Sequence, residues 1–557
     1  MSIVRVVFLL LIVAAARPVA AQEQDEARHS ALVREAVARF ALESVIPLPH
    51  GDSGSTVARQ PASVRELRLM DAVELALAQN LDIAVERLNP QAADYQLAGL
   101  RNNFLPVASS NIGQRAQVIA PTNQLNGGQR VTNDTSTYNF GVTQLSPWGG
   151  GALGLTFNNS RLSTSNIFAN FNPTYTTTLT ATYTQPLLRG FGLDSLRQQI
   201  AVTQVNRDIA AEQLRGTIAT TVANVRNAYW DLAYAAAVVD VARRSLALAE
   251  SLVADNQARV EVGTLAPIDV VQAEAEAANR RQTLAQVEAT WATAQLSLKR
   301  FLVTGTSDPL WTLELRAVDL PQLDFPPLDL EGAVRTALER RTDLVTARKN
   351  LESNDITLRF WRNEALPDVD LQAVYGAQGI GGTGFIRQGT GLGSVIVGTI
   401  PGGYSDALSL MRSRDFPTWN LALNVSYPIG GNAAQAQVAR TRVLRTQQNT
   451  RLRALELQIA TEVTNAALQA QANVRRVEAA RAARAFAERR LDAEQSKFEV
   501  GLSTSYFVVQ AQRDLADAQN AELRALTDLQ KALVTFERAQ ESPAFGGGFG
   551  GQGGGIQ

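Results

Sequence analysis

The side chains best suited to catalysis are scarce in this sequence. It holds two histidines, His29 and His50, and no cysteine, which excludes thiol nucleophiles and disulfides. Both histidines precede the repeated region described below, and no lysine stands in the Gly-x4-Gly-Lys-Ser/Thr pattern that holds nucleotide phosphates. We therefore expect no enzymatic activity, no metal centre and no cofactor.

The positions whose spacing does suggest a function are two glycine turns. Glu261-Val262-Gly263 recurs 238 residues later as Glu499-Val500-Gly501, and Val-Val-Gln-Ala follows each triplet after six intervening residues. Glycine reaches positive φ at no steric cost. Each turn is therefore predicted to end one helix before the chain returns in another.

An earlier stretch of the chain also repeats. Residues 71–77 resemble residues 331–338, and Leu105-Pro106 returns as Leu366-Pro367. The first copy holds more residues than the second between its Leu-Pro pair and its glycine turn. The chain is therefore predicted to be an internal duplication with one enlarged region.

Long helices are predicted around both glycine turns. After Pro186 and after Pro428, about 70 residues precede each turn without a further proline. A helix of that length would be roughly 100 Å long and would need coiled-coil partners. Residues 69–102 also have helical periodicity, and Pro90 predicts a kink or break between two helices there.

Between residues 104 and 186, and again between 366 and 428, the apolar period changes to two, which predicts strands. The clearest alternating run is Trp419, Leu421, Leu423, Val425 and Tyr427. A ten-residue alternating strand with aromatic residues at both ends is typical of a membrane β-barrel, where apolar side chains face lipid and polar ones face the lumen. A half-buried strand of a soluble sheet shows the same alternation.

The number of strands stays open at this point. The tight connection at 147–151 fits either end of a barrel, so the chain contributes four or six strands. Residues 376–415 are rich in glycine, and we expect them to form a long extracellular connection.

The ends of the chain and its charge give further predictions. Residues 1–21 have an apolar run and small residues before Gln22, which fits a cleaved secretory signal. An extension at 22–65 and a glycine-rich tail at 542–557 are expected to flank the repeats. Because Lys+Arg 52 nearly balance Asp+Glu 53, nucleic acid is not an expected partner.

The sequence resembles the TolC-like outer-membrane efflux family over residues 67–539. Four features carry the resemblance: the duplication, the turns Val262-Gly263 and Val500-Gly501-Leu502-Ser503, the segment Asn227-Ala228-Tyr229-Trp230-Asp231-Leu232, and Gln185-Pro186-Leu187-Leu188. The fold implied is an α+β membrane protein, a trimeric duct in which outer-membrane β-barrel strands continue into a long periplasmic coiled-coil α-barrel. The implied organisation is a first repeat at 66–310, a linker at 311–330 and a second repeat at 331–541, with strands at 104–186 and 366–428 and turns at 263 and 501.

The resemblance also implies partners. It predicts a homotrimer in contact with outer-membrane lipid, acting as the passive exit duct of a tripartite efflux or type I secretion system. A periplasmic adaptor would couple the duct to an inner-membrane pump. Two alternatives are a periplasmic adaptor, which would have one long hairpin, and a coiled-coil scaffold, which would not explain the alternating strands.

In this family the helical turns form a periplasmic tip that closes the resting channel and meets the adaptor. The resemblance assigns this contact to Val262, Gly263, Thr264, Val500, Gly501, Leu502 and Ser503. Asp269 is a candidate gate residue, because the family often has an acid there, although an acid beside Pro267 also suits a helix N-terminus. Phe507 and Gln510 stand where some members carry acids, so an apolar constriction is the alternative to an acidic ring.

Overall fold

The computed structural model describes residues 64–120, 130–319, 329–389 and 394–541. All of them belong to the second of two compact units, 63–557. The predicted signal, most of the predicted extension, the glycine-rich tail and both histidines lie outside the described residues. The domain boundaries given above stay predictions.

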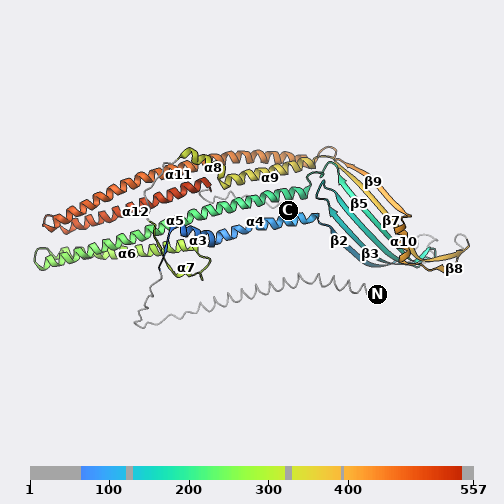
Figure 1. The fold of residues 1–557 in the computed structure, drawn as a ribbon, viewed down its shortest axis with the longest axis horizontal. Coiled ribbons are helices and arrows are strands. Elements are labelled where there is room, and N and C mark those ends of the chain that lie inside the picture. Colours follow the sequence, from blue (N-terminus) through green and yellow to red (C-terminus); the bar gives the residue numbers. More distant parts are fainter. Residues whose placement is uncertain (1–63, 121–129, 320–328, 390–393, 542–557) are drawn as a thin grey trace, which may run out of the picture. The chain divides into compact units, whose positions relative to one another are not determined.

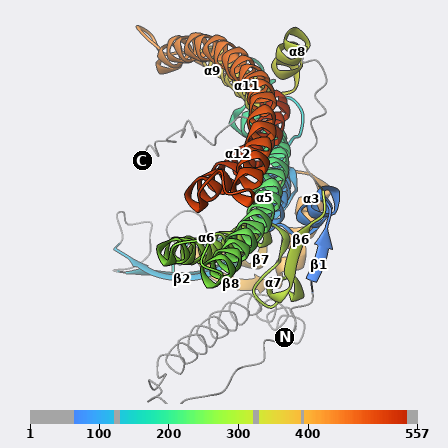
Figure 2. The same ribbon diagram turned by 90° about the vertical axis from the view of Figure 1, so that its left-hand side faces the viewer.

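Two long helical hairpins dominate the described unit (Figure 1). The first consists of α5 (Ser195–Glu261) and α6 (Pro267–Leu302), and the second of α11 (Ala433–Glu499) and α12 (Ser505–Glu541). Helices α5 and α11 each have 67 residues, about 100 Å at 1.5 Å per residue. Figures 1 and 2 show the hairpins side by side, and α5 packs against α12.

Local sequence explains where these helices begin. The side chain of Asp194 accepts the backbone N–H of Arg197 at the start of α5, and Asn432 accepts that of Ala434 at the start of α11. Pro267 is the first residue of α6, where its missing N–H costs no helical hydrogen bond. The long predicted helices are thus present, and side-chain caps fix the starts of α5 and α11.

Shorter helices pack against the two hairpins. They are α3 (Leu69–Gln79), α4 (Leu81–Arg101), α7 (Pro309–Thr312), α8 (Leu330–Arg340) and α9 (Thr342–Glu364), with a 3-10 turn at Asn102–Phe104. The break between α3 and α4 is at Asn80, whose side chain caps α4, whereas Pro90 lies inside α4. The prediction of two helices is confirmed, but the position of the break was wrong.

Seven antiparallel strands of the described residues form one sheet: β2 (Val107–Ile119), β3 (Val131–Leu145), β4 (Ala152–Thr164), β5 (Phe171–Pro186), β7 (Asp368–Gln388), β8 (Val395–Ile400) and β9 (Pro417–Ser426). The order is β2-β3-β4-β5-β7, and β7 pairs with β9 along its first half and with β8 at its far end. Six strands therefore run side by side, and β8 extends one end.

The turn at 146–151 lies at the end of the sheet where β5 leads into α5, which we call the helix end. There Arg197 of α5 donates hydrogen bonds to the carbonyl oxygens of Ser146 (2.8 Å) and Pro147 (3.3 Å). This position decides between the two strand counts, because β3 and β4 then cross the full sheet. The chain contributes six crossing strands, with β8 in addition.

Helix α10 (Tyr404–Ser413) packs on one face of β7. A Cβ at Gly379 would lie 1.8 Å from the Ala407 carbonyl oxygen, and one at Gly381 would lie 2.5 Å from that of Gly403. The predicted loop at 376–415 was therefore wrong in part: β7 continues to Gln388, and its glycines allow a helix to approach the sheet.

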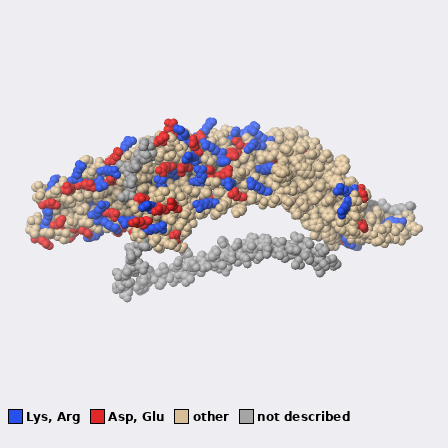
Figure 3. Space-filling model, in the orientation of Figure 1, with Lys and Arg blue, Asp and Glu red and all other residues tan. Residues whose placement is uncertain are grey.

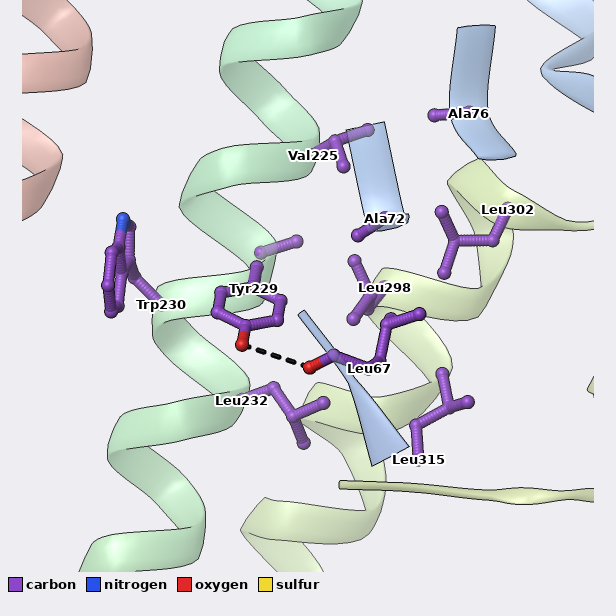
Figure 4. Packing of buried hydrophobic residues seen from close by; sticks show 11 residues of the cluster. Leu67, Ala72, Ala76, Val225, Tyr229, Trp230, Leu232, Leu298, Leu302 and Leu315 are labelled. Carbon is purple, nitrogen blue, oxygen red and sulfur yellow. Dashed lines mark hydrogen bonds between the residues drawn. The ribbon is translucent and has the colours of Figure 1, made fainter. Parts of the chain in front are cut away.

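A third structural feature joins the start of the described unit to its middle. Strand β1 (Val64–Leu67) pairs in parallel with β6 (Glu314–Ala317), and Leu67 is buried against α5 and α6. The Tyr229 hydroxyl donates to the Leu67 carbonyl oxygen at 3.0 Å (Figure 4). Burial raises the pKa of Tyr229 to about 12, so this hydroxyl stays a donor at physiological pH.

None of the helices in the described ranges is both long enough and apolar enough to cross a membrane.

Candidate functional site

The two hairpin tips have the same backbone geometry. At the first, Gly263 has a φ of 80° and its N–H bonds the Val260 carbonyl oxygen at 3.0 Å, while the Thr264 N–H bonds that of Arg259 at 2.9 Å. At the second, Gly501 also has a φ of 80°. This pair of hydrogen bonds is the Schellman motif, which ends a helix at a left-handed glycine.

The second tip repeats these bonds one for one. The Gly501 N–H donates to the Phe498 carbonyl oxygen at 3.2 Å, and the Leu502 N–H donates to that of Lys497 at 2.8 Å. A Cβ added at Gly263 or Gly501 would meet no atom within 4 Å. Backbone conformation, and not crowding, therefore requires glycine at both tips.

Both tips carry apolar side chains in solvent. Val262 is 73% exposed, Val500 is 70% exposed and Leu502 is 80% exposed. Four further exposed apolar residues lie in the first turns of the returning helices: Ile268, Val271, Tyr506 and Phe507. Apolar exposure of this extent is typical of a surface that another protein covers.

The two tips are joined to each other inside one chain. The Ser505 hydroxyl donates to an Asp269 carboxylate oxygen at 3.0 Å, which links α12 to α6. The Arg259 guanidinium donates to the Phe498 carbonyl oxygen at 3.1 Å and stands 4.4 Å above the centre of the Phe498 ring. A charged hydrogen bond and a cation–π contact thus hold α5 against α11.

A buried ion pair lies about two turns further along α6 than Asp269. Glu276 of α6 is 5% exposed, and it accepts hydrogen bonds from Arg280 of its own helix and Arg513 of α12. Burial alone would raise the pKa of Glu276, but the two guanidinium groups hold it below its ordinary value. Glu276 therefore stays ionised and joins the two hairpins at neutral pH.

The structure brings one of the three candidate gate residues into the link between the tips. Asp269 bonds Ser505, as described above, whereas Gln510 donates to Asp514 of its own helix at 2.9 Å. Phe507 is exposed, with its ring edge-on to that of Tyr506 at 5.5 Å. The fourth tip residue of the second repeat, Ser503, donates to Glu494 at 2.8 Å.

Sequence reasoning missed the residues that join the hairpins: Arg259, Glu276, Phe498, Ser505 and Arg513. For Arg259 the repeat gave no signal, because Lys497 stands at the matching position and its side chain bonds Glu494 instead. Glu276 could not be singled out from the sequence, because its burial is a property of the folded chain.

The sheet presents a second candidate functional surface. Residues that pair directly across strands point to the same face, so the register assigns Val142, Leu155, Ala181, Tyr375 and Trp419 to one face. The large apolar side chains of this face are exposed: Ile112, Tyr138, Phe140, Val142, Leu153, Leu155, Leu179, Tyr183, Tyr375, Trp419, Leu421, Leu423 and Val425. We call this set the apolar belt.

The opposite face of the same strands is polar. On β5 it consists of threonines at every second position: Thr174, Thr176, Thr178, Thr180, Thr182 and Thr184. Asn139 and Thr143 of β3, Thr156 and Asn158 of β4, and Asn420 and Asn424 of β9 share this face. We call it the hydroxyl–amide face.

Charge is distributed unevenly over the described unit. Figure 3 shows Lys, Arg, Asp and Glu intermixed over the helices, while the surface between them and the far end of the sheet is almost free of charge. The described residues include no group of three or more His, Cys, Asp or Glu side chains placed to hold a metal ion.

Comparison with known proteins identifies one family. The family described as outer membrane efflux protein matches residues 152–303 and 333–540. None of the curated proteins matches the chain.

Solved structures share the fold at low sequence identity. A membrane protein from Pseudomonas aeruginosa is 17% identical, with a TM-score of 0.60 over 85% of this chain and 90% of that one. The Vibrio cholerae outer membrane protein VceC is 15% identical, with a TM-score of 0.58 over 86% and 97%. The Campylobacter jejuni CmeC outer membrane channel is 13% identical, with a TM-score of 0.59 over 89% and 93%.

Proposed function

The chain belongs to the outer membrane efflux protein family, and we propose that three copies form the passive exit duct of a tripartite efflux or type I secretion system. The resemblance seen in the sequence is confirmed, and the protein is an efflux channel protein of the outer membrane. The alternative of a periplasmic adaptor or scaffold is not favoured. The observation that best supports the duct is that one chain has both an apolar belt suited to contact with lipid and helices about 100 Å long.

Unpaired strand edges support assembly. Strand β2 pairs with β3, and β9 pairs with β7, which leaves the other edge of each without a partner in the described residues. A membrane sheet needs every backbone group paired, because lipid offers no hydrogen bonds. Pairing β2 of one copy with β9 of the next would close the sheet into a barrel.

The helices support the same assembly. Helix α9 packs against both α5 and α11, whereas α4 packs against α5 and leaves an apolar stripe in solvent. The stripe has the helical spacing of one face, at Leu81, Val85, Leu88 and Tyr95. If the halves are an internal duplication, α4 takes the place of α9 between α5 and the α11 of a neighbouring copy.

The exposed hairpin tips are the proposed adaptor contact, at Val262, Gly263, Thr264, Val500, Gly501, Leu502 and Ser503. The shared Schellman geometry would give three copies six tips of one shape, a repeating surface for several adaptor molecules. The contacts at Asp269 and Arg259 form the proposed gate, because separating the hairpins breaks them. Phe507 is proposed to narrow the opening and Gln510 to line it.

The helices would extend into the periplasm, and the adaptor would couple them to an inner-membrane pump.

The first test is the native mass and shape of the protein extracted by detergent from outer membranes. We expect an elongated trimer of the 60.1 kDa chain, less any cleaved signal, with helices extending roughly 100 Å beyond the detergent belt. A monomer or a compact dimer would contradict the duct.

The adaptor contact needs a separate test. Leu502→Ala removes an 80% exposed side chain and should leave the trimer intact while lowering efflux of a fluorescent dye from cells. Phe486→Ala, which truncates a 66% exposed residue on the shaft of α11, is the matched control. Equal efflux in both variants would remove Leu502 from the contact.

A further inference from the structure

The sheet of this chain is wide for one subunit of a three-copy barrel. Strands β2, β3, β4, β5, β7 and β9 lie side by side (Figure 1). The β2–β3 ladder runs from Val107↔Thr143 to Ile119↔Val131, and the β4–β5 ladder from Ala152↔Thr184 to Leu162↔Thr174. All four strands of the first half thus span the height of the apolar belt.

The enlarged region of the first half supplies this width. The second half contributes β7 and β9 to the belt, whereas the first contributes two hairpins. The turn between β3 and β4 is fixed at the helix end by Arg197, and the side chain of Gln185 also bonds the Gly149 carbonyl oxygen there. The second hairpin is therefore an integral part of the sheet and not an extracellular loop.

We propose that three such sheets close into a barrel of 18 strands whose wide, nearly uncharged lumen admits large hydrophilic polymers, including polypeptides. This inference rests on the trimeric duct proposed above. Strands about 4.8 Å apart and tilted by about 40° give 18 strands a backbone diameter of roughly 36 Å, against roughly 24 Å for 12 strands. Short side chains inside would leave lumens of roughly 25 Å and 14 Å, respectively.

The chemistry of the wall defines the class of solute. The hydroxyl–amide face becomes the lumen because the apolar belt must face lipid. Within the described strands, the charged residues of the hydroxyl–amide face are Arg115, Asp368 and Asp370. Asp368 is paired with Arg189. A wall of hydroxyl and amide groups gives little selection between cations and anions, so size is the main restriction on passage.

Single-particle images of the trimer in lipid nanodiscs test the strand number directly. We expect a cross-section through the membrane with 18 strands and a backbone diameter of roughly 36 Å. A trimer with a 12-stranded barrel would overturn the inference while leaving the proposed duct intact. Particles that were not trimeric, or that failed to enter the nanodisc, would overturn both.

Thiol labelling tests the width of the lumen, and the natural chain has no cysteine to interfere. Thr182→Cys places a thiol on the hydroxyl–amide face, and Ala181→Cys places one at the same depth on the apolar belt as the matched control. The probes are maleimide-poly(ethylene glycol) molecules with diameters of about 10 Å and about 20 Å, below and between the two lumen estimates.

We expect both probes to label the Thr182→Cys protein in nanodiscs and neither to label the Ala181→Cys protein. Labelling of Thr182→Cys by the small probe alone would overturn the wide lumen. Labelling of Ala181→Cys in place of Thr182→Cys would reverse the two faces, and would overturn the membrane orientation of the proposed duct as well.

Discussion

At the scale of single residues, Arg259 makes the most specific contact between the two hairpins. It bonds the Phe498 carbonyl oxygen and covers the Phe498 ring, so Arg259→Ala removes both interactions. A charge-assisted hydrogen bond contributes about 1.5 kcal/mol, which would raise the ratio of open to closed channels about 10-fold. Single-channel recordings in planar bilayers would measure this ratio.

The matched control for this change lies on the same helix. Arg244 bonds the Asp240 carbonyl oxygen of α5, so Arg244→Ala removes an arginine without touching α11. An open fraction that rises equally in both variants would show that loss of charge, and not separation of the tips, had caused the effect.

Glu276 provides a second prediction at this scale. Glu276→Gln leaves Arg513 without its ionic partner and should lower the free energy of unfolding at pH 7 by about 2 kcal/mol. Glu250→Gln, which breaks an exposed pair with Arg281 inside one hairpin, should cost at most about 0.5 kcal/mol. Thermal unfolding followed by circular dichroism would measure both changes.

The same pair predicts a pH dependence. The folded-state pKa of Glu276 lies below its ordinary value of 4.5, so its stabilising effect is complete above pH 4.5 and is lost as the pH falls through the folded value. The difference in stability between the natural chain and Glu276→Gln should therefore be constant from pH 8 to pH 5 and shrink in stronger acid. A difference that persisted in strong acid would contradict this account.

Residues whose type is dictated by local geometry were predictable. Gly263 and Gly501 were found because a left-handed helix end requires glycine whatever surrounds it. Arg259 and Phe498 were not, because arginine and phenylalanine occur on many helix faces. Their partnership depends on which side of α5 meets α11, a property that the sequence of either helix alone does not determine.

At the scale of elements, α10 depends on the glycines of β7. Gly379→Ala would place a Cβ 1.8 Å from the Ala407 carbonyl oxygen, so α10 must move away from the sheet. We expect hydrogen exchange in residues 404–413 to accelerate about 10-fold or more, as overpacking typically costs 1–3 kcal/mol. Gly403→Ala, whose Cβ would meet no atom within 4 Å, should leave the exchange unchanged.

The elements also show where periodicity is sufficient for prediction. The helices around both turns and the alternating strands were predictable, because each has a long run of one period. Two errors share a cause, since Pro90 and the glycines of 376–415 were interpreted as breaks. Pro90 is tolerated inside α4, and Gly379 and Gly381 serve close packing, which depends on distant partners.

At the scale of the whole molecule, the apolar stripe on α4 gives a test of assembly. Leu88→Asp places a charge in the centre of the proposed contact with a neighbouring copy, and we expect it to prevent formation of the trimer. Asn89→Asp adds the same charge at the next position, outside the stripe, and should leave the trimer unchanged. Native mass spectrometry after detergent extraction would distinguish the two results.

The overall architecture was predictable in kind but not in width. Repetition and the change of period indicated two halves, each with strands and a long hairpin. The number of crossing strands depended on the position of a single turn, and that position depends on Arg197, an α5 residue about fifty positions away. Local sequence patterns do not reveal contacts between residues so far apart in the chain.

The pairing of β1 with β6 has a consequence for biosynthesis. A secreted chain emerges from the inner membrane starting at its N-terminus, so Val64–Leu67 enters the periplasm long before Glu314–Ala317, its partner in the sheet. Until then Leu67 lacks the pocket that buries it, and the strand offers an unpaired edge to other nascent chains. Slow export should therefore favour aggregation of this protein, and periplasmic chaperones that hold extended segments should matter most during that interval.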